Sequence, residues 1–181
     1  MESRIFCVYI FTLIHLFPAC KKNSVDATVP CIIQSDTVAI APKLLTLSDA
    51  ERIMGEPVKL TCNSFMKKID TLEYACDYTA LSEDRITRKT GKLYFIYEIY
   101  AGVAAAHNAY LSIYQANRMH PGVEIVPGLG DEAYYHSDGT NFYFFLVRKN
   151  EKMIRLKSNK TTSHSSPEEF KRVIKLIVDR I

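Results

Sequence analysis

Residues 141–159 read NFYFFLVRKNEKMIRLKSN and carry a strong strand pattern within this 181-residue chain. Two apolar runs, 141–149 and 152–159, are joined by a short polar connection. A connection of this length joins antiparallel neighbours, whereas parallel strands need a long crossover. The first run is apolar on both alternating faces, which favours a central strand with helices covering both sides of the sheet.

Further strands and helices lie on either side of this hairpin. Alternating apolar residues predict strands at 58–63, 73–81, 92–101 and 132–136. Helical spacing predicts helices at Leu47–Met54, at 102–118 and from Pro167 to the C-terminus. The order α-βββ-α-βββ-α, with connections short enough for hairpins, indicates an α+β domain. We expect a mostly antiparallel sheet of about six strands with flanking helices.

Residues 5–17 are almost entirely apolar. As a helix this run reaches only about 20 Å, short of the ~30 Å hydrocarbon core, so it is typical of a signal peptide. The following Ala19-Cys20 resembles a bacterial lipobox, in which the cysteine is lipidated and becomes the mature N-terminus. The commonest lipobox differs at Phe17 and Pro18. A secreted protein without a lipid and an uncleaved anchor are the alternatives.

These signals divide the chain into a signal peptide at 1–19, a lipidated Cys20 with a polar tether at 20–43, and a single domain at 44–181. The expected location is outside the cytoplasm, anchored to a membrane and facing the periplasm or the cell surface. A net charge of +3 and 48% hydrophobic residues exclude a strongly basic nucleic-acid binder and a disordered chain. The expected partners are the membrane and an unknown envelope protein or small ligand, with no cofactor.

Two cysteines lie in neighbouring predicted strands, Cys62 and Cys76. Disulfides persist in exported proteins. A bridge between these two would close a loop of roughly 15 residues and contribute about 3 kcal/mol in the chain-entropy model. We predict this disulfide, with two reduced and buried thiols as the alternative. No CxxC or clustered Cys/His spacing indicates a metal site.

The segment 127–133, PGLGDEA, precedes an aromatic strand. Its two glycines permit positive φ angles or close backbone approach. It lacks the third glycine of a dinucleotide site and the Lys-Ser/Thr pair of a phosphate loop. A structural turn is the favoured interpretation. A ligand loop is the alternative, in which Gly128, Gly130 and Asp131 border a cleft.

The tyrosines suggest where a ligand would bind. In one interpretation helices cover both faces of the sheet. In the other, one face is partly open and forms a groove for an apolar or carbohydrate-like ligand or a peptide, lined by Tyr94, Tyr100, Tyr135 and Tyr143.

A catalytic role has weaker support in the sequence. Asp131, His136 and Ser137 are the residue types of a hydrolase, but neighbours on a strand alternate faces, and the chain has no nucleophile elbow. We therefore predict no catalytic residue. The expected function is a non-catalytic binding or sensing domain. A structural or assembly accessory that binds another envelope protein is the alternative, and a hydrolase is the third hypothesis.

Three short strings carry a family resemblance: the segment from Leu44-Leu45-Thr46 to Gly55, the string Cys76-Asp77-Tyr78, and the glycine-rich segment at 128–133. Together they resemble a group of small exported lipoproteins, best known from actinobacteria. That group is related in fold to the extracytoplasmic sensor domain of a mycobacterial serine/threonine kinase. The resemblance implies an antiparallel sheet with flanking helices, a cleft and no established enzymatic activity. Lys43 stands where that group often has a cysteine, so its disulfide is not implied here.

Overall fold

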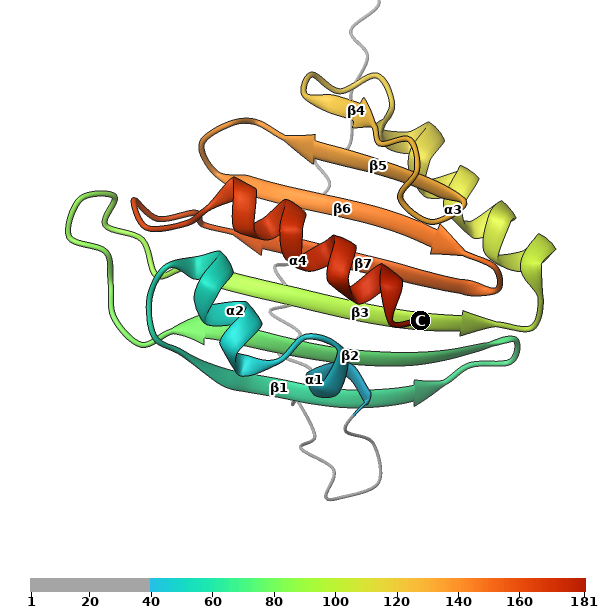
Figure 1. The fold of residues 1–181 in the computed structure, drawn as a ribbon, viewed down its shortest axis with the longest axis horizontal. Helices are drawn as coiled ribbons and strands as arrows, with labels where there is room; N and C mark the ends of the chain where they lie inside the picture. Colours follow the sequence, from blue (N-terminus) through green and yellow to red (C-terminus); the bar gives the residue numbers. More distant parts are fainter. Residues whose placement is uncertain (1–39) are drawn as a thin grey trace, which may run out of the picture. The chain divides into compact units, whose positions relative to one another are not determined.

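The computed structural model describes residues 40–181, in which four helices flank a seven-stranded sheet (Figure 1). The helices are α1 (Ile40–Leu44), α2 (Leu47–Met54), α3 (Val103–Asn117) and α4 (Pro167–Asp179). The strands are β1 (Val58–Lys67), β2 (Thr71–Ala80), β3 (Lys92–Tyr100), β4 (Val123–Ile125), β5 (Glu132–Ser137), β6 (Phe142–Lys149) and β7 (Lys152–Asn159).

All strand pairs in the sheet are antiparallel, and the spatial order is β1-β2-β3-β7-β6-β5-β4. The predicted α+β class is confirmed, as are the six predicted strands. The sequence patterns missed β4, because a three-residue strand is too short to show alternation. β4 lies at the edge of the sheet and pairs only with β5 among the described residues.

Helix α2 begins and ends, and helix α4 begins, at the residues that the local sequence predicts. Thr46 and Asp49 form a capping box at the start of α2, and Gly55 ends that helix in the left-handed conformation at φ +68°. Ser166 caps α4 by accepting a hydrogen bond from the Glu169 amide at 3.1 Å. These bonds satisfy amides that the helix itself leaves unpaired.

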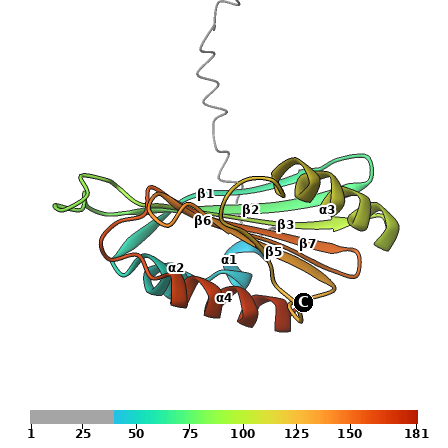
Figure 2. The same ribbon diagram turned by 90° about the horizontal axis from the view of Figure 1, so that it is seen from above.

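The helices form two layers, one on each face of the sheet (Figure 2). Helices α1, α2 and α4 cover what we call the α4 face, and α3 covers part of the opposite α3 face. The main core lies under α4 and includes the fully buried Phe95, Leu156 and Phe170. A smaller core around Tyr110, Tyr134, Leu146 and Met153 lies under α3. Burying one such large side chain contributes roughly 1.5–3 kcal/mol.

The folded domain begins before the predicted boundary at residue 44. Residues 40–43, assigned to the tether by composition, belong to α1, and Ala41 is fully buried in the main core. The Tyr78 hydroxyl donates a hydrogen bond of 2.7 Å to the Leu45 carbonyl, which fixes β2 to the connection between α1 and α2. Residues 40–43 read IAPK, an apolar patch at the end of the predicted tether, and the packing of Ala41 makes this patch part of the domain.

The predicted signal peptide, Cys20 and most of the tether lie outside the described residues. None of the helices within residues 40–181 has the length and hydropathy needed to cross a bilayer.

The predicted Cys62–Cys76 disulfide is wrong. Cys76 is a buried free thiol. In the β1–β2 register, Cys62 lies opposite Asp77, and Cys76 lies opposite Asn63. Because side chains on a strand alternate, the two cysteines point to opposite faces of the sheet and cannot be joined.

Candidate functional site

The glycine-rich segment forms a structural turn that leads into β5 and lies beside the end of β6. Gly130 has φ +65°, and its neighbour Asp131 donates its amide hydrogen to the Arg148 carbonyl at 2.8 Å. A Cβ atom on Gly130 would lie 2.5 Å from that same carbonyl oxygen. The favoured interpretation of the sequence, a structural turn, agrees with this geometry.

A buried arginine fixes the turn to the sheet. Arg148 is 7% exposed, and its guanidinium donates to the carboxylates of Glu132 and Asp131. Asp131 also accepts the Asn150 amide at 2.7 Å, and Glu132 pairs with His107 of α3 at 2.9 Å. Burial acts to raise the pKa of Glu132, but the hydrogen bonds from His107 and Arg148 outweigh it, so that pKa is lowered. Asp131 and Glu132 therefore serve as counter-ions of a buried cation.

The turn holds the loop at residues 126–129 between two concave surfaces. One, which we call the α4 pocket, has a volume of about 410 Å³ and lies between this loop and α4. It is lined by Glu124, Ile125, Val126, Pro127, Gly128, Leu129, Tyr135, Phe145, Lys171 and Lys175. Its volume falls within the usual range for small-molecule sites, about 300–1,000 Å³.

The base of the α4 pocket is aromatic and firmly packed. Tyr135 and Phe145, which we call the aromatic floor, are directly paired on β5 and β6, with ring centroids 5.0 Å apart. Phe170 of α4 packs against both rings at 6.5 and 5.7 Å. Burial raises the pKa of Tyr135, so its phenol is neutral at physiological pH.

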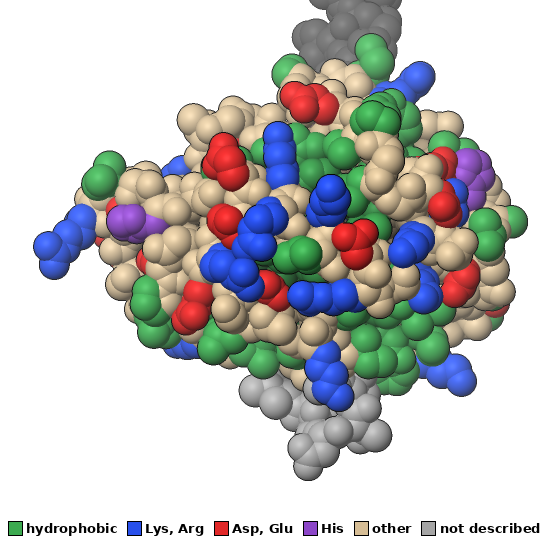
Figure 3. All heavy atoms as spheres, in the orientation of Figure 1, with side chains coloured by type: hydrophobic (Ala, Val, Ile, Leu, Met, Phe, Trp, Pro, Cys, Tyr) green, Lys and Arg blue, Asp and Glu red, His purple; other side chains and the backbone are tan. Residues whose placement is uncertain are grey.

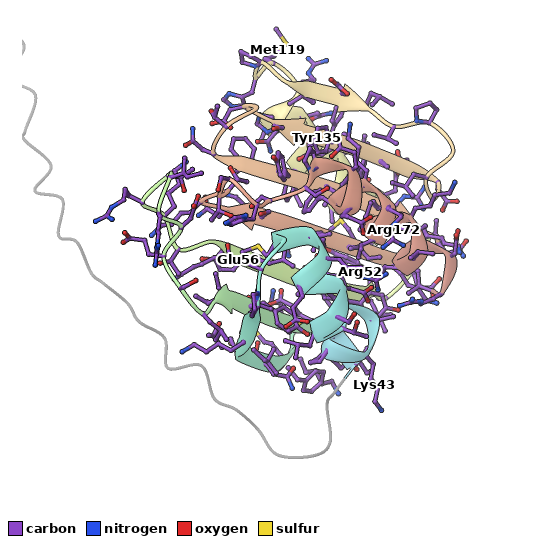
Figure 4. All side chains as sticks on the ribbon, turned by 60° about the vertical axis from the view of Figure 1, so that its left-hand side comes forward. Lys43, Arg52, Glu56, Met119, Tyr135 and Arg172 are labelled. Carbon is purple, nitrogen blue, oxygen red and sulfur yellow. The ribbon has the colours of Figure 1, made fainter. Side chains whose placement is uncertain are left out.

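The α4 wall of the pocket carries two exposed lysines one helical turn apart, Lys171 and Lys175, which we call the lysine pair. The Lys171 ammonium lies 4.6 Å from the centroid of the Tyr135 ring. Figure 4 shows Tyr135 on β5 beside α4. Neither lysine forms an ion pair with any residue from 40 to 181.

The arginines on the same side of the molecule are neutralised, unlike the lysine pair. Arg172 pairs with Glu169, and Arg52 with Asp49. Figure 4 shows these two arginines on the adjacent helices α4 and α2. Figure 3 shows basic and hydrophobic side chains side by side on this face. Unneutralised positive charge therefore lies at the α4 pocket, over its aromatic floor.

A second concave surface, the α3 pocket, lies on the other side of the same loop. It has a volume of about 270 Å³ and is lined mainly by Tyr110, Leu111 and Tyr114 of α3, residues 125–129 and residues 131–133. No lysine or arginine lines it. The loop at 126–129 is thus a wall that the two pockets share. The α4 pocket has two lysines in its lining, whereas the α3 pocket has Asp131 and Glu132 and no basic residue.

The predicted site residues are only partly brought together. Gly128 and Tyr135 line the α4 pocket, and Gly128 and Asp131 line the α3 pocket. Gly130 shapes the turn without lining either of them. Tyr143 is buried on the α4 face against Phe170, at 5.6 Å between ring centroids, and lies outside the pocket lining.

The expected groove of four tyrosines is wrong, because the tyrosines lie on both faces. Tyr94 is paired with Lys157 of β7, which is paired with Phe144 of β6. Phe144 belongs to the α3 face, so the Tyr94 side chain lies on that face too. Tyr100, an even number of residues further along β3, points to the same face. Tyr135 and Tyr143 belong to the core under α4. The register that joins β3 to β7 and β6 decides this, and it cannot be read from any one strand.

Sequence reasoning missed Phe145 and the lysine pair. The available signal was the position of Lys171 and Lys175, four residues apart at the border of the apolar stripe of the C-terminal helix. That spacing places both on one face of the helix, but only the packing of α4 onto the sheet brings them to Tyr135.

The hydrolase residues do not converge. Asp131 precedes β5 and His136 lies near its far end, about 16 Å along an extended strand. The Ser137 hydroxyl donates to the Phe142 carbonyl at 2.9 Å, whereas His136 stacks on His120. Burial lowers the pKa of His136, and His120 lowers it further. These three residues therefore form no nucleophile and base pair.

Within residues 40–181, no three His, Cys, Asp or Glu side chains are grouped to hold a metal ion. The chain matches no protein-family model, and neither a curated protein nor a solved structure is significantly similar to it. The candidate site accordingly rests on its own geometry.

Proposed function

We propose that this chain is a non-catalytic ligand-binding or sensing domain of a membrane-anchored lipoprotein, and that the α4 pocket is its binding site. The observation that carries the proposal is a concave surface whose base is the buried aromatic floor and whose α4 wall carries two exposed lysines that have no carboxylate partner among residues 40–181. The membrane anchor rests on the apolar run at 5–17 and on Cys20.

The rigidity of the pocket supports binding. Tyr135 and Phe145 are paired in the sheet and packed against Phe170, so a ligand would not have to order them. Binding then avoids the cost of immobilising side chains, roughly 0.5–1.5 kcal/mol for each. The Arg148 contacts hold the end of the neighbouring loop in the same way.

The second candidate, an accessory that binds another envelope protein, has its own supporting observation. Met119 and Ile125 are 86% and 57% exposed, on either side of the start of the edge strand β4. An exposed apolar edge of a sheet can add a strand from a partner.

The test of the α4 pocket uses the full chain and the neutral fluorescent dye N-phenyl-1-naphthylamine. Ile125→Asp places a charge beside both pockets, Leu111→Asp places one in the α3 pocket alone, and Leu60→Asp is the matched control on the opposite edge strand, where Leu60 is 44% exposed. We expect the dye to bind, and Ile125→Asp to weaken binding by about fivefold, since one charge disfavours contact with apolar surface. Leu60→Asp should bind as the unmodified chain does.

An absence of dye binding to the unmodified chain would contradict the proposed function. Leu111→Asp should also leave dye binding unchanged, because Leu111 lines only the α3 pocket. Weakening by Leu111→Asp or Leu60→Asp as strong as that by Ile125→Asp would contradict the assignment to the α4 pocket. Binding of an envelope protein that Ile125→Asp abolishes, without any dye binding, would favour the accessory function.

A further inference from the structure

We infer that the α4 pocket binds an amphipathic anion: a small molecule with one carboxylate, sulfonate or phosphate group joined to an apolar body. The anionic group lies at the lysine pair and the apolar body on the aromatic floor. This inference rests on the proposed function and specifies the ligand class of that same site.

The positive charge of the lysine pair on the α4 wall favours a ligand with an anionic group. Lys171 and Lys175 are separated by one helical turn, which puts their Cβ atoms about 6 Å apart. The two ammonium groups, on adjacent helical turns, repel each other weakly, and an anion between them offsets that repulsion. Both line a concave surface whose base is aromatic and whose loop wall is apolar, where a positive potential is focused more strongly than on an open surface.

The aromatic floor and the apolar loop of the pocket favour a ligand with an apolar body. Tyr135 and Phe145, 7% and 2% exposed, form the base of the pocket, and the loop adds the apolar residues Val126, Pro127 and Leu129. The Lys171 ammonium already lies over the Tyr135 ring, 4.6 Å from its centroid. A ligand must therefore combine an acid at α4 with an apolar part that begins within a few ångströms of it.

The single acid in the pocket lining gives the ligand a direction. Glu124 lies on β4 and forms no ion pair with either lysine. It disfavours an anion on the β4 side and leaves the α4 side as the place for the charged group. The apolar body then runs from α4 toward the loop at 126–129.

The test compares two dyes on the full chain. The anionic dye 1-anilinonaphthalene-8-sulfonate has both parts of the inferred ligand, and N-phenyl-1-naphthylamine has the same ring system without the sulfonate. We expect the anionic dye to bind at least ~10-fold more tightly, with an advantage that shrinks as salt screens the lysine pair. The neutral dye should bind with little dependence on salt.

The double variant Lys171→Gln, Lys175→Gln should remove that advantage and leave the affinity for the neutral dye within about twofold. The matched control, Lys59→Gln with Lys67→Gln, removes the same charge from exposed positions on β1 at the other edge of the sheet. It should leave the affinity for both dyes unchanged. Glu124→Gln should raise the affinity for the anionic dye by about twofold, since it removes a negative charge that repels the sulfonate.

Two further binding experiments distinguish a free amphiphile from a membrane lipid as the natural source of the anion. Displacement of the anionic dye by monomeric dodecanoate supports a free amphiphile. The other source, a lipid headgroup, is supported by two results together. Dodecanoate does not displace the anionic dye, and the chain binds phosphatidylglycerol vesicles in a lysine-dependent way but does not bind phosphatidylcholine vesicles. Equal affinity for the two dyes, or an anionic preference that survives the Lys171/Lys175 change, would overturn the inference while the proposed function stands. Failure of both dyes to bind would contradict the proposed function itself.

Discussion

Replacing each glycine of the 127–133 segment by alanine should separate its two roles. Gly128 and Gly130 both have positive φ angles, +76° and +65°. A Cβ atom on Gly128 would meet nothing within 4 Å, whereas one on Gly130 would lie 2.5 Å from the Arg148 carbonyl oxygen and 3.0 Å from a Val147 methyl group. The two substitutions therefore share a backbone cost and differ in a steric one.

The shared cost is that of placing a non-glycine residue in the left-handed region, about 1–2 kcal/mol. At Gly130 the turn must also move away from β6, which adds the cost of overpacking, about 1–3 kcal/mol. That movement stretches the bond of 2.8 Å from the Asp131 amide to the Arg148 carbonyl, a further loss of roughly 1 kcal/mol. We expect Gly128→Ala to lower the free energy of unfolding by about 1–2 kcal/mol and Gly130→Ala by about 3–6 kcal/mol.

Urea unfolding of the full chain, followed by far-UV circular dichroism, measures this difference directly. In a thermal melt of a domain of this size, the melting temperature falls by roughly 3 °C per kcal/mol, so Gly130→Ala should melt about 9–18 °C lower and Gly128→Ala about 3–6 °C lower. Equal losses within about 0.5 kcal/mol would refute the argument, because the close approach to Arg148 would then have no energetic consequence.

Three other predictions follow from single groups. Cys20→Ser should abolish incorporation of a labelled fatty acid into the chain, and continued labelling would exclude lipidation at that residue. Burial raises the pKa of the Cys76 thiol to about 12, so Cys76 should resist alkylation in the folded protein and react after unfolding, as mass spectrometry of the native and urea-treated chain would show; rapid native labelling would contradict the assigned burial. Asp84 accepts hydrogen bonds from Ser163, Thr87 and the Ile86 amide, which hold its pKa below the ordinary value. Its contribution to stability is therefore full above about pH 4 and is lost as pH falls toward the folded pKa. Asp84→Asn should be less stable at neutral pH and lose less stability on acidification; an unchanged acid dependence would refute this linkage.

The elements that the sequence predicted well are those whose signals are local. Thr46, Asp49 and Gly55 define α2 within a ten-residue window, and the structure has this helix at Leu47–Met54 as expected. Strand β7 has the predicted bounds, and its partner β6 begins at Phe142, one residue later than expected. Caps, short connections and apolar periods act between neighbours in the chain, so they can be read without knowing the fold.

The errors came from features that depend on pairing. Cys62 and Cys76 lie in adjacent strands as expected, but their register points them to opposite faces. The composition of residues 20–43 as a whole predicts a tether, yet Ala41, in an apolar patch of that segment, is fully buried in the main core. Neither outcome follows from the composition of a short segment.

The candidate site shows the same division. The sequence singled out Gly128 and Tyr135, since glycines that permit a turn and aromatic strand residues are visible locally. It did not bring them together with Lys171, which is over thirty residues further along the chain and belongs to another element. The packing of α4 onto the sheet places that lysine over the Tyr135 ring.

The amino-acid sequence alone therefore defined the α+β class, six of the strands, three of the helices and the turn at 127–133, because each depends on residues close together in the chain. The tertiary structure decided which face each side chain occupies, and with it the fate of the cysteines, the separation of the tyrosines and the composition of the α4 pocket. The physical reason is the period of two along a strand: a shift of one residue in pairing reverses every side chain, and that pairing is set by contacts between distant segments.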